Sequence, residues 1–139
     1  MIKNYLFILL VALTFSSCSI DDDSNSNLSF KSLPIKEAIV PTEFEYRKSY
    51  TVKVTYDLPD KCHSFHSLYY KYNNTSRIVA ITALFDSAGD CTETDAVIEK
   101  EYEFVVNVNQ TEDYTFRFWK GEDSQGNDIF EDIVVPVIK

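Results

Sequence analysis

The feature that most constrains this chain is the strict alternation of apolar and polar side chains in the segment SYTVKVTYDLP. The two parities separate cleanly, as Tyr50, Val52, Val54, Tyr56 and Leu58 against Thr51, Lys53, Thr55 and Asp57. Successive side chains of a strand point to opposite faces of a sheet, so a period of two indicates a half-buried β-strand. Beyond the apolar N-terminal run, no segment has a convincing helical period. The chain is therefore expected to bury its core between sheets.

Further strand-like segments follow along the chain. The sequence predicts an edge strand at 34–41, interrupted by Pro41, and a strand at 97–108 with an acidic outer face. Two hairpins are also predicted, with the ranges 67–72 and 77–85 around NNTS, and 114–121 and 127–138 around EDSQG. About seven strands without helical crossovers predict an antiparallel β-sandwich.

Two stretches resemble immunoglobulin-like modules. VPTEFEYRKSYTVKVTYDLP is similar to their first two strands, and EDYTFRF is similar to the start of their sixth strand. The resemblance implies a tyrosine corner, in which the hydroxyl of Tyr114 bonds back to the backbone. It also implies the fold class: an all-β, immunoglobulin-like antiparallel β-sandwich of about seven strands, over residues 31–139. This fold hosts many functions and by itself implies none.

The N-terminus has the plan of an export signal. Lys3 is followed by the apolar and small-residue run YLFILLVALTFSS, which is too short to span a bilayer, and the run ends at Cys18. FSSC resembles the lipobox of bacterial lipoproteins, and Phe15 in place of the usual Leu resembles lipoproteins of the Bacteroidota. The resemblance implies a signal peptide at 1–17 and a lipidated Cys18. The alternative is an ordinary signal peptide with an incidental cysteine.

The polar segment SIDDDSNSN that follows cannot bury enough apolar surface to order itself, so residues 18–30 are interpreted as an acidic tether. Its aspartates resemble the export signal of Bacteroidota lipoproteins that are displayed on the outer face of the outer membrane. We therefore expect an outer-membrane lipoprotein exposed at the cell surface. The alternatives are that the tether is merely solvated, or that the protein faces the periplasm.

The remaining cysteines form a pair. An exported compartment is oxidising, so Cys62 and Cys91 are predicted to form a disulfide that closes a loop of about 30 residues and contributes roughly 3–4 kcal/mol. Pairing around NNTS places residue 62 near residue 87, at the open end of the hairpin. The bridge would differ from that of antibody domains, which joins the second and sixth strands. The alternative is a zinc site of Cys62, His63, His66 and Cys91, although adjacent Cys62 and His63 chelate awkwardly.

Other chemistries have little support in the sequence. The net charge of −9 disfavours nucleic acid as a partner, and the scarcity of glycine excludes a Gly-rich phosphate loop. Ser64 lies between two histidines without a recognisable nucleophile spacing, so no catalytic residue and no cofactor are expected. Asp123, Asn127 and Asp128 carry oxygens that suit calcium, but their spacing is not that of an EF-hand.

The aromatic residues offer the best candidate site. Strand parity puts Trp119 on the face opposite Tyr114, Phe116 and Phe118, and Tyr69 and Phe130 also fall on an outer face. These three form a possible platform for a glycan or a protein ligand, unless a neighbouring strand or the N-terminal segment covers them. The expected function is a non-catalytic binding or accessory module that is held at the membrane by its lipid anchor. The alternative is a small envelope metal-binding protein or enzyme that uses Cys62, His63 and His66.

Overall fold

A computed structural model describes residues 27–91 and 97–139 of the chain. The predicted signal peptide, Cys18 and most of the predicted tether lie outside these residues. Within the described ranges, no helix is long and apolar enough to cross a membrane.

The described residues form ten β-strands. In chain order they are β1 (Leu28–Leu33), β2 (Ile35–Ile39), β3 (Phe44–Glu45), β4 (Ser49–Leu58), β5 (His63–Asn73), β6 (Ser76–Asp86), β7 (Ile98–Asn107), β8 (Tyr114–Glu122), β9 (Asp128–Val135) and β10 (Val137–Ile138). The seven predicted strands are all present, and β1 and β3 are additional. The predicted strand at 127–138 is divided into β9 and β10 at Pro136, which has no N–H to donate to a ladder.

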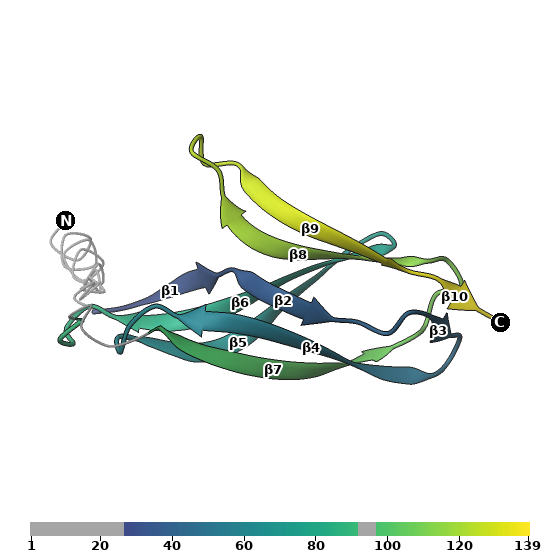
Figure 1. Ribbon diagram of the computed structural model, residues 1–139, viewed down its shortest axis with the longest axis horizontal. Coiled ribbons are helices and arrows are strands. Elements are labelled where there is room, and N and C mark those ends of the chain that lie inside the picture. Colours follow the sequence, from purple (N-terminus) through teal and green to yellow (C-terminus); the bar gives the residue numbers. More distant parts are fainter. Residues whose placement is uncertain (1–26, 92–96) are drawn as a thin grey trace, which may run out of the picture.

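Two sheets pack face to face (Figure 1). One has the order β2–β4–β7, and the other contains β5, β6, β8, β9 and β1. A short parallel pair, β3 with β10, closes one end. In both sheets, the side chains that point inward along each strand form the core. The largest fully buried side chains include Tyr114, Phe44, Phe116, Phe118, Ile35 and Ile81. The protein is thus an all-β, immunoglobulin-like β-sandwich, as the sequence predicts.

Two different strands pair along the same edge of strand β6. Its first part pairs in parallel with β8, from Ser76↔Thr115 to Val79↔Phe118. Its second part pairs antiparallel with β1, from Ile81↔Leu33 to Asp86↔Leu28. β8 therefore leaves the sheet after Val79, and the β8–β9 hairpin projects away from the body of the domain (Figure 1). The parallel pairing departs from the antiparallel arrangement that the sequence predicts, because strand periodicity carries no information about partners distant in the chain.

A buried arginine holds the junction at which β8 joins β6. Arg77 is only 2% exposed, and its guanidinium lies 4.3 Å from the ring of Tyr72 and 4.7 Å from that of Tyr114. It donates hydrogen bonds to the carbonyls of Asn74 and Ser76 and to Oε1 of Gln110. These bonds tie the β5–β6 turn to the segment before β8 and so fix where the two strands meet.

The predicted tyrosine corner is present. The hydroxyl of Tyr114 accepts a hydrogen bond from the backbone N–H of Asn109 at 3.1 Å, five residues upstream. The same hydroxyl donates to Oδ1 of Asn109. Buried Tyr114 is thereby satisfied on both its donor and acceptor sides.

The predicted disulfide is confirmed: Cys62 and Cys91 are bonded, with Cα atoms 5.4 Å apart. The register differs by one residue from the predicted pairing, because a bulge between Phe65 and Ser67 shifts the end of β5. The carbonyl of Cys62 accepts a hydrogen bond from the N–H of Asp86 rather than facing residue 87. The bridge still closes the open end of the β5–β6 hairpin.

A candidate ligand-binding groove

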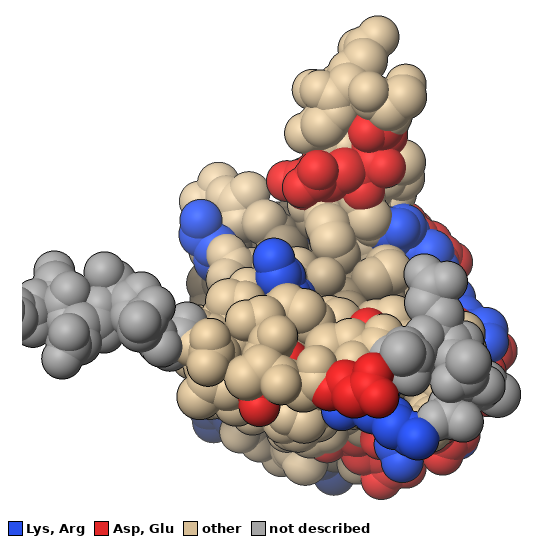
Figure 2. All heavy atoms as spheres, turned by 90° about the vertical axis from the view of Figure 1, so that its left-hand side faces the viewer, with Lys and Arg blue, Asp and Glu red and all other residues tan. Residues whose placement is uncertain are grey.

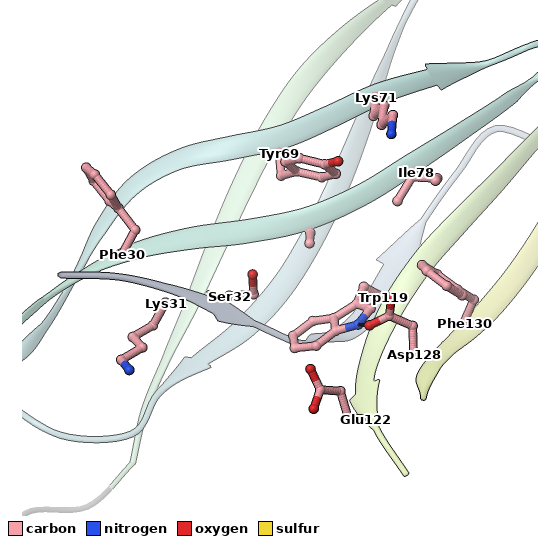
Figure 3. Close-up of a pocket in the computed structure, with 11 residues that line it drawn as sticks. Phe30, Lys31, Ser32, Tyr69, Lys71, Ile78, Trp119, Glu122, Asp128 and Phe130 are labelled. Carbon is pink, nitrogen blue, oxygen red and sulfur yellow. Dashed lines mark hydrogen bonds between the residues drawn. The ribbon is translucent and has the colours of Figure 1, made fainter. Parts of the chain in front are cut away.

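A groove of about 600 Å³ lies where the β8–β9 hairpin separates from the sheet. It is bounded by β1, β5 and β6 on one side and by the hairpin on the other. Its lining consists of Phe30, Lys31, Ser32, Tyr69, Lys71, Ile78, Ala80, Trp119, Glu122, Asp128 and Phe130. All three residues of the predicted aromatic platform are among them, and Figure 3 shows them around one space.

Trp119 and Phe130 face each other across the β8–β9 ladder. Directly opposite residues of an antiparallel pair lie on the same face, so both rings point away from the core. The indole Nε1–H of Trp119 donates a hydrogen bond to Oδ1 of Asp128 at 2.7 Å. Phe130 has the guanidinium of Arg117 4.4 Å from its ring centre. Both rings are half-buried and are held in place by these neighbours.

A β-bulge between Trp119 and Gly121 places Glu122 in the groove. Without the extra residue, a side chain three positions after Trp119 would point to the other face. With it, Glu122 pairs with Asp128, which shares the face of Phe130. Lys120, the bulged residue, donates hydrogen bonds from Nζ to Glu131 and to the carbonyl of Lys36, each at 2.9 Å. Gly121 has φ of +113°, a backbone conformation that residues other than glycine rarely adopt.

The tip of the hairpin is organised by Asp123. Its Oδ1 accepts the backbone N–H groups of Gln125 and Asn127, and its Oδ2 accepts the side-chain amide of Asn127. These bonds lower the pKa of Asp123, with the amide of Asn127 the largest cause. Of the three residues considered for calcium, Asp123 and Asn127 are thus bonded to each other within the turn, and Asp128 accepts a hydrogen bond from Trp119. In the part of the chain that the structure describes, no group of three His, Cys, Asp or Glu side chains is arranged to hold a metal ion.

The sheet side of the groove is formed by β5 and β6. Tyr69 lies opposite Ala80, and Lys71 lies opposite Ile78. Tyr69 is 44% exposed, and its side chain makes no hydrogen bond or ring contact with the other described residues. Neighbouring strands therefore leave its ring and hydroxyl accessible to a ligand.

Sequence reasoning missed a fourth aromatic side chain, Phe30. It lies on β1, is 64% exposed, and has its ring 4.7 Å from that of His66. β1 begins at Leu28, three residues before the predicted domain start. The alternation of Leu28 and Phe30 with Ser29 and Lys31 was the signal that could have revealed this strand.

The charges of the groove are divided between its two sides. Glu122 and Asp128 come from the hairpin, and Lys71 comes from the sheet. Lys31 also borders the groove, but its side chain shares the face of Ala83 and holds its ammonium over the ring of Phe85 instead. Figure 2 shows acidic side chains on the projecting hairpin and Lys and Arg side chains on the body beneath it. Two carboxylates and one ammonium thus belong to the groove itself.

The residues of the CHSFH segment are not arranged as the metal or catalytic site that the sequence offered as an alternative. Both thiols are in the disulfide, so neither is available as a thiolate ligand. His63 Nδ1 lies 2.7 Å from Oδ1 of Asp60, and this contact is the main cause of a lowered pKa for Asp60. His66 lies against Phe30, and Ser64 Oγ bonds weakly to the carbonyl of Leu84 at 3.5 Å. The described residues thus contain no nucleophile–base pair in this segment.

Comparison with known proteins places the chain in a family. The family described as the ORF11 beta-sandwich domain matches residues 52–134, which is more than half of the chain. This match extends from β4 into β9 and includes Tyr69, Trp119 and Phe130, but not Phe30. No curated protein and no solved structure matches the chain. The protein therefore belongs to the ORF11 beta-sandwich domain family.

Proposed function

We propose that this protein is a lipid-anchored, non-catalytic binding module of the bacterial cell surface that holds a glycan or protein ligand in the groove between the β8–β9 hairpin and the sheet. One observation carries the proposal. Trp119 and Phe130 come from the β8–β9 hairpin and Tyr69 comes from the distant strand β5, and all three line the same groove. Aromatic side chains gather in this way at binding surfaces because they offer large contact area at little entropic cost.

The way in which the fold holds these three side chains supports a binding role. All three side chains project from strands rather than loops, and the indole of Trp119 is fixed by Asp128. A site held by rigid elements loses little conformational entropy when it binds. Catalysis would need a positioned nucleophile or acid–base pair beside the ligand, and of the two lining carboxylates Asp128 is already bonded to the indole of Trp119.

The proposed location at the cell surface depends on the N-terminal sequence. FSSC resembles a lipobox, so Cys18 is the proposed site of lipidation, and the aspartates that follow support display at the outer face of a Bacteroidota-type outer membrane. Stable anchoring requires at least two acyl chains, which a lipidated N-terminal cysteine supplies. The net charge of −9 makes nucleic acid a poor candidate ligand.

A pull-down on intact cells tests the proposal. Cells that display the wild-type protein should retain labelled glycans or proteins that cells displaying Trp119→Ala do not. Tyr46→Ala is the matched control, because Tyr46 is an exposed tyrosine beside β3, at the end of the domain opposite the hairpin tip. Equal retention by wild type and Trp119→Ala would remove the groove from the proposal. Turnover of a substrate by the purified protein, abolished by His63→Ala or His66→Ala, would replace binding with catalysis.

A further inference from the structure

We infer that the ligand of the groove is a neutral oligosaccharide. This inference rests on the proposed binding function and narrows it from any glycan or protein to one chemical class. Three properties of the groove carry it: the arrangement of its rings, the mixture of its hydrogen-bonding groups, and the presence of charges of both signs.

The rings suit the flat faces of sugars. The face of an aromatic ring carries partial negative charge, and the C–H groups of a pyranose face carry partial positive charge, so the two stack favourably. Trp119 and Phe130 present their rings from the hairpin, and Tyr69 presents its ring from the sheet across the groove (Figure 3). A short chain of sugars can therefore contact rings on both sides.

The polar groups suit hydroxyls. A sugar hydroxyl both donates and accepts hydrogen bonds, so its site needs groups of both kinds. Glu122 can accept, Lys71 can donate, and the hydroxyl of Tyr69 can do both. The side chains of these three residues make no hydrogen bond with the rest of the described chain. They remain available for a ligand without breaking an existing contact.

The charges favour a neutral ligand over a charged one. The ammonium of Lys71 offsets part of the charge of the two lining carboxylates, and one of these, Asp128, is already bonded to the indole of Trp119. An anionic ligand would be repelled by Glu122 and Asp128, and a cationic one by Lys71. Neutral sugars meet no net repulsion and use both signs as hydrogen-bonding partners.

The size of the groove favours a small ligand over a protein. Small-molecule sites commonly have volumes of about 300–1,000 Å³, and this groove has about 600 Å³. A stable protein interface instead buries at least about 1,000 Å² of surface in total. The groove is thus of a size that a short oligosaccharide fills.

The tryptophan content of the chain provides a direct probe. Trp119 is the single tryptophan, so its fluorescence reports on the groove alone. The protein is purified from expressing cells in a detergent without a sugar headgroup. It is then titrated with neutral gluco-, xylo-, manno- and galacto-oligosaccharides, with acidic oligogalacturonates and with cationic chitosan oligosaccharides. Tyr69→Ala tests the second ring, and Tyr46→Ala serves as the control.

We expect a neutral oligosaccharide to change the Trp119 emission saturably, with an affinity little altered by added salt. Tyr69→Ala should weaken this binding by about tenfold, which is the effect of removing an aromatic side chain that contributes about 1.4 kcal/mol. Tyr46→Ala should leave the affinity unchanged. This pattern supports the inference.

Other outcomes separate the two proposals. Binding of only the charged oligosaccharides would overturn the neutral class. Failure of every oligosaccharide, together with Trp119-dependent retention of a purified protein ligand, would overturn the carbohydrate inference and leave the binding function. Absence of any Trp119-dependent binding would overturn both.

Discussion

The indole Nε1–H of Trp119 and the carboxylate of Asp128 are joined by a 2.7 Å hydrogen bond across the β8–β9 ladder. Asp128→Ala should release the indole and reduce the near-ultraviolet circular dichroism of Trp119. It should also lower the free energy of unfolding by about 1 kcal/mol, because a hydrogen bond to a carboxylate is lost at a partly exposed site. Asp132→Ala is the control, since Asp132 pairs with Arg117 and not with Trp119. An unchanged Trp119 spectrum in Asp128→Ala would contradict the prediction.

Removal of the disulfide should destabilise the domain. The bridge spans a sequence separation of 29 residues, and the chain-entropy model gives such a loop about 3–4 kcal/mol. Cys62→Ser with Cys91→Ser should lower the free energy of unfolding by this amount in a denaturant titration. The native protein should weigh two hydrogens less than its reduced form by mass spectrometry. Two freely alkylating thiols in the native protein would count against the bridge.

The tyrosine corner can be tested by removing one oxygen atom. Tyr114→Phe leaves the buried ring in place but deprives the backbone N–H of Asn109 of its acceptor. A loss of about 1–2 kcal/mol in the free energy of unfolding is expected. Tyr69→Phe removes a hydroxyl that has no partner in the described chain and should cost nothing measurable. Equal effects of the two substitutions would show that the corner does not stabilise the domain.

The bulge that brings Glu122 into the groove depends on Gly121. Gly121→Ala forces a side chain into a backbone conformation with φ of +113°, although nothing lies within 4 Å of the added Cβ. The expected cost is therefore backbone strain of about 1–3 kcal/mol rather than a steric clash. Thermal unfolding and the Trp119 emission should both change. A variant as stable as the wild type, with an identical spectrum, would mean that the bulge does not need a glycine.

The hairpin tip should be sensitive to acid. The pKa of Asp123 is lowered in the folded protein, so Asp123 contributes stability that is fully present above its ordinary pKa of about 4. This stability is lost as the pH falls through the folded-state pKa. Asp123→Asn should therefore melt at a lower temperature than the wild type at neutral pH, and the difference should disappear in acid. Glu112→Gln, at an exposed carboxylate without a side-chain bond, should track the wild type at every pH.

The strands and their faces were predictable because each is encoded locally. Alternation alone placed Val52 and Val54 inside and Trp119 outside, and the structure agrees. The disulfide followed from an even pair of cysteines in a chain that resembles an exported protein. These features depend on neighbouring residues or on residue counts, which a sequence displays directly.

The groove was predictable only in part, because it depends on partners distant in the chain. Parity put Trp119, Tyr69 and Phe130 on outer faces, but it could not tell that they share one space. That space exists because β8 leaves β6 after Val79 and β1 takes over the edge. β1 itself was missed because five of its six residues are exposed and it follows an acidic, polar segment.

The pairing of β1 has a mechanical consequence. Hydrogen bonds of an antiparallel ladder run perpendicular to the strands, and β1 holds β6 through six successive pairs from Leu28 to Leu33. In the proposed lipid-anchored module, tension between the chain ahead of Leu28 and a ligand bound at Trp119 would act along β1. It loads the six pairs in shear together instead of peeling them apart one after another. This geometry would keep the proposed binding module folded under fluid flow while it holds a ligand.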